Sequence, residues 1–252
     1  MIVTTDLTKT YGDAVIVNGV SLTVPRGGVT SIIGSNGAGK STLLALMSRL
    51  LEPTSGSVMV DGLDVSSTQG DLLAQRLSIL RQDNHIPTRL TIRDLVAFGR
   101  YPYSKGRLTE EDHAFIDKSI GYLGLGDLAD RFIDEISGGQ RQRAFVAMVL
   151  CQNTDYVLLD EPLNNLDMKH AVVMMKLVRR IADEFRKTFV LVLHDINFAS
   201  IYSDNIIAMR DGVVVHQGSP NEIVRSDVLR DIFDIDIAIH DVAGHRLGLY
   251  YL

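Results

Sequence analysis

One stretch of the sequence decides the fold: Gly34-Ser35-Asn36-Gly37-Ala38-Gly39-Lys40-Ser41-Thr42. It matches the pattern G-x-x-x-x-G-K-[ST], in which glycines let successive backbone N–H groups face one anion. An apolar run precedes it and helix-forming residues follow, so the positive end of a helix dipole adds to the same site. A chance glycine-rich turn is the weaker alternative. We expect a phosphate loop, with Lys40 reaching the β- and γ-phosphates and Ser41 offering a hydroxyl to Mg²⁺.

Three apolar runs each lead into residues that can take part in binding or catalysis. Residues 29–33 lead into the phosphate loop (residues 34–42), residues 156–159 lead into Asp160, and residues 189–193 lead into His194. None of the runs alternates with polar residues, which is typical of central strands in a parallel sheet covered on both faces. Such sheets bind ligands beyond the carboxyl ends of their strands. Asp160 can hold Mg²⁺ through water and Glu161 can polarise an attacking water, although a strand that simply reaches solvent is the alternative.

Helical and turn signals complete the architecture. Helices are expected at residues 40–51, 140–150 and 169–186, and residues 91–135 are expected to form a helical insertion. Asp61-Gly62 and Asp211-Gly212 lie between apolar stretches, as tight hairpin turns do, and they predict antiparallel strands beside the parallel core. The fold class is therefore α/β with a mixed, mainly parallel sheet.

A further glycine motif is the pair Gly138-Gly139 in Ser137-Gly138-Gly139-Gln140. Ser137 is a good N-cap for the helix that follows. Two glycines at a helix start would let a phosphate approach the backbone N–H groups. Because Ser-Gly-Gly also forms ordinary turns, the residues alone leave both interpretations open.

The composition of the chain limits the classes of function that it can have. The chain has 252 residues, of which 46% are hydrophobic and 22% are charged, and its net charge is −6 with a pI of about 5.6. This acidic balance argues against nucleic acid as a partner. The lone cysteine, Cys151, lies in an apolar run and is expected to fill the core. No apolar stretch approaches the roughly 18 residues that span a bilayer, and residues 1–6 lack the features of a secretion signal, so we expect a cytosolic chain.

Taken together, these motifs resemble the ATP-binding cassette (ABC) ATPases over nearly the whole chain. Residues 136–140 are similar to the signature sequence of that family, with Ile136 where leucine is commoner. The phosphate loop and residues 156–162 are similar to its Walker A and Walker B segments. The resemblance implies a P-loop NTPase cassette with an antiparallel β subdomain and an inserted helical subdomain. It also implies ATP and Mg²⁺ as cofactors and a Mg-dependent ATPase coupled to transport.

The resemblance assigns roles to matching positions. Tyr11 matches the aromatic that stacks on adenine, Gln82 matches the glutamine that touches Mg²⁺, and His194 matches the histidine that contacts the γ-phosphate. Residues 163–167 match a loop that contacts a second copy. There Asn164 replaces a common serine, a change expected to touch the dimer contact and not the chemistry. The implied catalytic residues are Glu161, His194 and Lys40; the implied nucleotide-binding residues are Tyr11, those of the phosphate loop, Ser137, Gly138, Gly139 and Gln140; and the implied metal ligands are Ser41, Gln82 and Asp160.

The same resemblance implies partners. One phosphate loop and one signature make half a site, so a head-to-tail dimer with two ATP molecules at its interface is expected. Residues 91–103 and 160–170 are similar to ATPases of bacterial iron–siderophore importers. This implies integral membrane permease subunits, indirectly a substrate-binding protein outside the cell, and a place at the cytoplasmic face of the membrane. A haem or vitamin B12 importer is the alternative, and a soluble cassette ATPase not acting in transport is a weaker one.

We expect the ATP-binding domain to span residues 2–236, with the helical subdomain at about residues 88–150, and a short C-terminal extension at residues 237–252. The alternating residues 232–237 predict a strand that ends the cassette. His240 and His245 follow in the tail. We interpret them as structural or solvated histidines and not as metal ligands.

Overall fold

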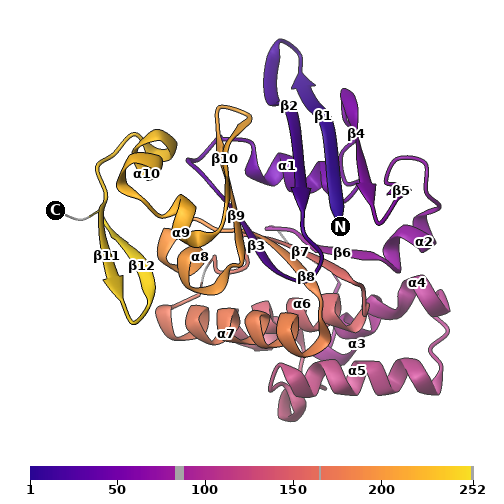
Figure 1. Ribbon diagram of the computed structural model, residues 1–252. Helices are drawn as coiled ribbons and strands as arrows, with labels where there is room; N and C mark the ends of the chain where they lie inside the picture. Colours follow the sequence, from indigo (N-terminus) through magenta and orange to yellow (C-terminus); the bar gives the residue numbers. More distant parts are fainter. Residues whose placement is uncertain (83–87, 165, 251–252) are drawn as a thin grey trace. The chain divides into compact units, whose positions relative to one another are not determined.

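The computed structural model describes residues 1–82, 88–164 and 166–250 (Figure 1). Its contacts divide the chain into two compact units. The split unit consists of Met1–Thr68 and Met175–Leu252, and the inserted unit of Gln69–Met174. Within the described residues, no helix is long and apolar enough to cross a membrane.

The split unit contains a parallel sheet with β3 (Gly28–Ile33) between β8 (Thr188–Val192) and β9 (Asn205–Arg210). In β10 (Val213–Gly218) the chain returns antiparallel to β9. Every residue of β8 is buried, as are all residues of β3 except the first. The expected strands at residues 29–33 and 189–193 are therefore confirmed within one residue at their ends. Burial on both faces explains why neither strand alternates.

A second, antiparallel sheet of the split unit has the order β2-β1-β4-β5. Its strands are β1 (Ile2–Tyr11), β2 (Ala14–Val24), β4 (Ser55–Val60) and β5 (Leu63–Asp64). Asp61-Gly62 joins β4 to β5 and Asp211-Gly212 joins β9 to β10. Both residues of each pair have φ between 48° and 82°, as a two-residue hairpin turn requires. The two predicted hairpins are thus confirmed.

The helices of the split unit are short. They are α1 (Lys40–Met47), α8 (Ile196–Tyr202), α9 (Pro220–Ile223) and α10 (Ser226–Phe233). Helix α7 (Met168–Phe185) is longer; it begins in the inserted unit and ends in the split unit, and it agrees within one residue with the expected 169–186. The prediction of a helix to residue 51 was too long, because Ser48 caps α1 and Arg49 takes a left-handed φ of 61°.

The strand predicted at residues 232–237 is wrong. Ile232 and Phe233 end helix α10, and Asp234 terminates it with a left-handed φ of 57°. Leu229 and Ile232, three residues apart, are both buried, so the helical period overrides the short alternation. The last strands follow later, as the hairpin of β11 (Ala238–Val242) and β12 (His245–Leu249).

The inserted unit combines a parallel strand pair with helices. Strand β6 (Leu77–Leu80) lies parallel to β7 (Tyr156–Asp160), with Leu77 opposite Tyr156. Helices occupy most of the stretch predicted to be helical, residues 91–135. The helical segments are α2 (Gly70–Ala74), α3 (Ile92–Ala97), η1 (Phe98–Arg100), α4 (Tyr101–Ser104), α5 (Glu110–Tyr122), η2 (Gly126–Leu128), η3 (Ile133–Glu135) and α6 (Gly138–Cys151).

A buried ion pair joins two of these helical segments. The Arg100 side chain is 5% exposed and the Asp112 side chain 4%, and Arg100 Nε donates to Asp112 Oδ1 at 2.8 Å. The guanidinium lies 3.9 Å from the ring centre of Tyr103 and 4.3 Å from that of Phe115. From the sequence alone, residues 100–103 resemble a surface turn. In the structure, their first residue, Arg100, carries a buried charge.

Cys151 is fully buried at the end of α6, which confirms the expectation that it fills the core. Burial raises the pKa of its thiol to about 11. Since the thiolate is the reactive form, the side chain is inert at neutral pH.

Candidate functional site

The phosphate loop is shaped by glycines, two of which, Gly34 and Gly39, have no room for a side chain. It connects β3 to α1, and Gly34, Gly37 and Gly39 have φ values of 147°, 83° and 94°. A Cβ on Gly34 would lie 2.1 Å from the carbonyl oxygen of Met209, and a Cβ on Gly39 would lie 2.5 Å from that of Ile16. The loop is thus fixed by its backbone fit against neighbouring strands.

Lys40 is held inside this loop. Its side chain is buried, and Nζ donates to the carbonyl oxygens of Gly34 at 2.9 Å and of Ser35 at 2.8 Å. Ser35, Asn36 and Gly37 are exposed. The first turn of α1 has no acidic residue, and its N-cap, Gly39, makes no side-chain cap. A buried ammonium and a helix start without carboxylates form a site that favours an anion.

His194 follows the neighbouring strand at the same edge. Ile32 of β3 pairs with Val192 of β8, and Leu193 N donates to the Ile32 carbonyl oxygen at 3.1 Å. His194 is exposed, and Asp195 caps α8 directly after it by accepting from Asn197 N at 2.7 Å. Parallel pairing in register therefore brings the residues after both strands, Gly34 and His194, to one edge of the sheet.

Tyr11 ends strand β1 and is 52% exposed. Lys9 Nζ lies 5.1 Å from the centre of its ring. An exposed ring of this kind can stack on a planar ligand. Its role toward adenine stays a prediction.

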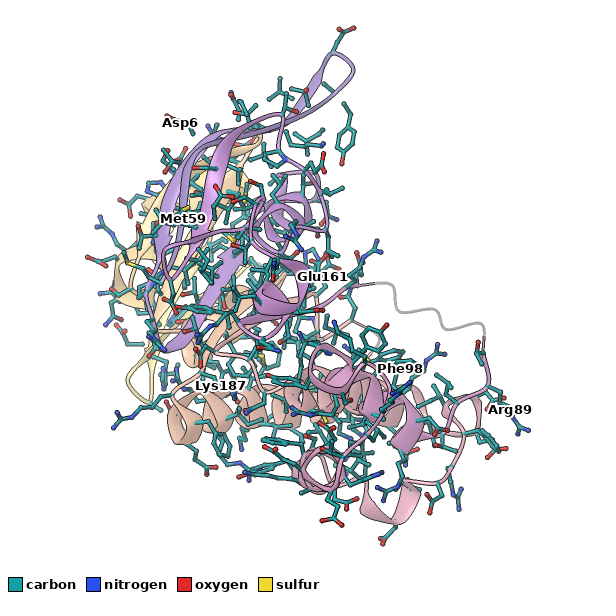
Figure 2. The ribbon with its side chains drawn as sticks, turned by 90° about the vertical axis from the view of Figure 1, so that its right-hand side faces the viewer. Asp6, Met59, Arg89, Phe98, Glu161 and Lys187 are labelled. Atoms are coloured by element: carbon teal, nitrogen blue, oxygen red, sulfur yellow. The ribbon has the colours of Figure 1, made fainter. Side chains whose placement is uncertain are left out.

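The acidic pair lies in the inserted unit. Tyr156 to Leu159 are buried in β7, and Asp160, the last residue of the strand, is half-buried. Glu161 comes next, with a left-handed φ of 50° that turns the chain sharply (labelled in Figure 2). The side-chain amide of Asn164 donates to the Glu161 carboxylate. Asn164 was expected to affect a dimer contact and not the chemistry; its amide also contacts the predicted catalytic residue Glu161, across a turn closed by a hydrogen bond from Asn164 N to Glu161 O. Its effect on the dimer stays a prediction.

Ser137 is the N-cap of α6, as expected. It forms a capping box in which its hydroxyl accepts from Gln140 N at 3.3 Å and Gln140 Oε1 accepts from Ser137 N at 2.9 Å. The helix begins at Gly138, two residues before the predicted start. Gly138 and Gly139 therefore form its first turn, and both Ser137 and Gly138 are exposed. The first N–H groups of a helix have no partner within it, so this helix start, in which Ser137 takes up the Gln140 N–H, can face an anion.

The chain is similar to known proteins over more than half of its length. Residues 17–164 match the family model described as ABC transporter. This chain belongs to the ABC transporter family. The ABC chain is 50% identical to the petrobactin import ATP-binding protein YclP of Bacillus subtilis (strain 168), over 251 residues that cover 100% of both chains. It is 53% identical to the petrobactin import ATP-binding protein FatE of Bacillus anthracis, over 95% of this chain and 96% of the relative.

Solved structures agree with the fold. The ABC chain is similar to the ATP-binding cassette MJ0796 in a dimeric, post-hydrolysis state bound to ADP and Pi. The TM-score is 0.78 at 29% identity, and the match covers 87% of this chain and 99% of that one. The predicted P-loop NTPase cassette is therefore confirmed.

The predicted metal ligands of the ABC chain fit Mg²⁺ by their chemistry. Ser41 offers a hydroxyl oxygen, Gln82 an amide oxygen and Asp160 a carboxylate, and Mg²⁺ prefers oxygen donors. Gln82 is exposed two residues after β6. Residues 83–87, and Asn165 of the expected dimer-contacting loop, lie outside the described part of the chain. The assignment of these ligands stays a prediction.

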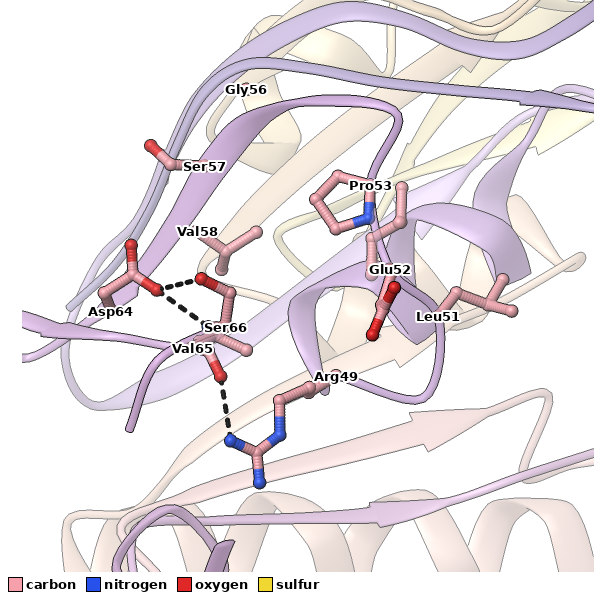
Figure 3. A pocket seen from close by; sticks show the side chains of 11 residues that line it. Arg49, Leu51, Glu52, Pro53, Gly56, Ser57, Val58, Asp64, Val65 and Ser66 are labelled. Atoms are coloured by element: carbon pink, nitrogen blue, oxygen red, sulfur yellow. Dashed lines mark hydrogen bonds between the residues drawn. The ribbon is translucent and has the colours of Figure 1, made fainter. Parts of the chain in front are cut away.

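A cavity of about 280 Å³ lies elsewhere in the split unit, between the end of α1 and strands β4 and β5 (Figure 3). Its polar groups serve the fold. Asp64 accepts from Ser66 N at 2.8 Å, and Arg49 donates to the Val65 carbonyl oxygen at 3.2 Å. We assign no ligand to it.

The contact between Asn164 and Glu161 gives a first prediction. Asn164→Asp replaces the amide donor by a second negative charge beside the Glu161 carboxylate. A hydrogen bond to a charged group contributes about 1.5–3 kcal/mol, so we expect kcat for ATP to fall by roughly tenfold or more while KM stays within about twofold. Steady-state phosphate release measures both constants. Asn221→Asp, at an exposed position of α9, is the matched control. An unchanged kcat in Asn164→Asp would show that Asn164 has no effect on the carboxylate.

Proposed function

We propose that this chain is the ATP-binding and ATP-hydrolysing subunit of an importer for iron–siderophore complexes. The observation that carries the proposal is the 50% identity, over the full length of both chains, to a petrobactin import ATP-binding protein. The predicted motif residues are of the types that such a subunit needs to bind ATP and Mg²⁺ and to activate water.

Each predicted site residue has a part in the proposed reaction. Tyr11 stacks on the adenine, and the phosphate loop with Lys40 binds the phosphates. Ser41, Gln82 and Asp160 would hold Mg²⁺, which supplies positive charge beside the phosphates when bound. Glu161 acts as the general base toward the attacking water. His194 contacts the γ-phosphate.

The proposed functional form is a head-to-tail dimer. Ser137, Gly138, Gly139 and Gln140 of one copy would close the nucleotide site of the other copy. Support comes from the exposure of Ser137 and Gly138 at the start of α6 and from the dimeric state of the similar cassette MJ0796. One phosphate loop and one signature in each chain then give two complete sites in the pair.

Membrane association requires a partner in this proposal. We propose integral membrane permease subunits, a substrate-binding protein that delivers the cargo to them, and a place at the cytoplasmic face of the membrane. Phe98 and Tyr101 of the inserted unit are both more than half exposed and offer apolar contacts to a permease (Phe98 is labelled in Figure 2). The exposed rings are consistent with a chain that binds a partner of this kind.

The domain boundaries also remain a proposal. Residues 2–236 would form the ATP-binding domain, with a helical subdomain at about residues 88–150 and an extension at residues 237–252. Helices α3 to α6 lie between residues 92 and 151, and the hairpin of β11 and β12 lies between residues 238 and 249, which supports this division.

A growth experiment tests the importer proposal. A strain that lacks this gene is grown under iron starvation with single iron sources: petrobactin, a hydroxamate, a catecholate or haem. We expect loss of growth on one siderophore class and normal growth on abundant inorganic iron, with recovery when the gene is returned. Loss of growth on haem alone would favour a haem importer. Unimpaired growth on every source would contradict siderophore import.

A further inference from the structure

His170 lies in the first turn of α7 and joins two segments of the inserted unit. Its Nδ1 lies 2.7 Å from Asp167 Oδ1, and its backbone N donates to the same oxygen at 2.8 Å. The carboxylate is an acceptor, so Nδ1 carries the proton in this bond. Both contacts hold the pKa of Asp167 below its usual range. The imidazole is thereby oriented by the loop that begins at Glu161.

The ring of His170 lies against the signature. A Cβ on Gly139 would lie 3.3 Å from Cγ and Cδ2 of His170 and 3.6 Å from Nδ1. A Cβ on Gly138 would meet nothing within 4 Å. Neither glycine has a positive φ. Gly139 is therefore constrained by the space that His170 occupies and not by its backbone conformation.

A second contact joins the same two segments. Gln142, in the first turns of α6, donates from Nε2 to the carbonyl oxygen of Pro162 at 3.0 Å. Pro162 directly follows Glu161, and His170 lies eight positions further on. Both ends of the segment from Pro162 to His170 thus touch the start of α6.

We propose that His170 is a positioning residue: its ring packs against Gly139 and fixes the first turn of α6 relative to the segment that carries Glu161. The signature turn and the acidic residue then move as one body when a second copy binds. Asp167 sets the orientation of the ring, and the missing side chain of Gly139 makes room for it. This proposal rests on the proposed dimer, in which the signature binds the nucleotide of the other copy.

A double-mutant cycle on Gly139 and His170 tests the proposal. The full chain carrying Glu161→Gln is the parent. Its dimer dissociation constant is measured by analytical ultracentrifugation over a series of protein concentrations in saturating ATP. We expect His170→Ala and Gly139→Ala each to weaken dimerisation by about tenfold, because one removes the ring and the other displaces it. In the double variant the added methyl fills part of the vacated space, so the effects are strongly non-additive and the loss stays near tenfold. Effects that multiply to about a hundredfold would overturn the proposal.

Two further variants separate the ring from its hydrogen bond. His170→Phe keeps a ring beside Gly139 and loses the Nδ1 donor, whereas His170→Asn keeps a donor and loses the ring. We expect His170→Phe to dimerise within about threefold of the parent and His170→Asn to behave like His170→Ala. The opposite order would assign the effect to the Asp167 bond and overturn the role of the ring. His113→Ala, at an exposed histidine of α5, is the matched control.

Nucleotide binding to the monomer separates positioning from misfolding. The affinity of each variant for a fluorescent ATP analogue at low protein concentration is expected to equal that of the parent, since the phosphate loop is untouched. A parallel loss of monomer affinity and dimerisation would mean that His170 only maintains the fold. If the parent itself fails to dimerise in ATP, the proposed dimer is wrong, whatever the His170 variants do.

Discussion

Glu161→Gln is expected to bind ATP with unchanged affinity, to hydrolyse it about 10²–10⁴-fold more slowly, and to accumulate as a dimer. Glutamine keeps the size and shape of the side chain but cannot accept a proton from water. The left-handed turn at Glu161 is unchanged, and the Asn164 amide can donate to a side-chain oxygen of either glutamate or glutamine, so the local geometry stays intact. The defect should therefore lie in chemistry and not in binding.

Two measurements check this result. Phosphate release gives turnover, and size-exclusion chromatography with and without ATP gives the oligomeric state. Glu184→Gln, at an exposed position of α7, removes one equivalent charge and should behave as the unsubstituted chain. Normal hydrolysis by Glu161→Gln would remove this residue from the mechanism.

Arg100→Met is expected to produce the largest loss of stability. It leaves the buried Asp112 carboxylate without its ionic partner, and breaking a buried pair in this way costs about 3–5 kcal/mol of unfolding free energy. For a chain of this size the melting temperature should fall by roughly 6–20 °C. Arg107→Met, at an exposed arginine, should change unfolding by less than about 0.5 kcal/mol. Thermal unfolding followed by circular dichroism distinguishes the two.

A double variant and a pH series test the cause of this loss. Arg100→Met with Asp112→Asn removes both charges but keeps an oxygen that accepts from Thr109, so more than half of the lost stability should return. Burial alone would raise the pKa of Asp112, but hydrogen bonds from Thr109 and Arg100 outweigh it and lower the pKa from its usual value of 3.8. The stabilisation is then fully present above about pH 4 and declines as the pH falls through the folded-state pKa. A difference between parent and Arg100→Met that grows on acidification would refute this account.

Local signals in the sequence predicted much of this molecule. The apolar strands, the glycine loop, the Asx-Gly hairpins and the N-cap at Ser137 all depend on residues within one turn or strand, and all are confirmed. The strand predicted at residues 232–237 is wrong because the five alternating residues 233–237 carry less information than the amphipathic helix α10, which extends into them.

Contacts between distant segments could not be predicted from the sequence. Arg100 and Asp112 belong to different helical segments, and nothing in their spacing shows that aromatic rings enclose the guanidinium. His170 and Gly139 are separated by a helix and a strand. The link between Asn164 and Glu161 is local, and the departure from serine at position 164 was its only sequence signal. Its meaning depended on the turn geometry.

The order in which the chain is synthesised determines when the phosphate loop can reach its final shape. Both neighbours of β3, strands β8 and β9, are translated more than 150 residues after it, and the carbonyl oxygen of Ala38 accepts from Gly212 N at 3.2 Å. A nascent chain on the ribosome therefore carries the loop sequence long before the backbone that encloses it exists. The phosphate loop can reach its final shape only after residues 188–212 have emerged, late in co-translational folding.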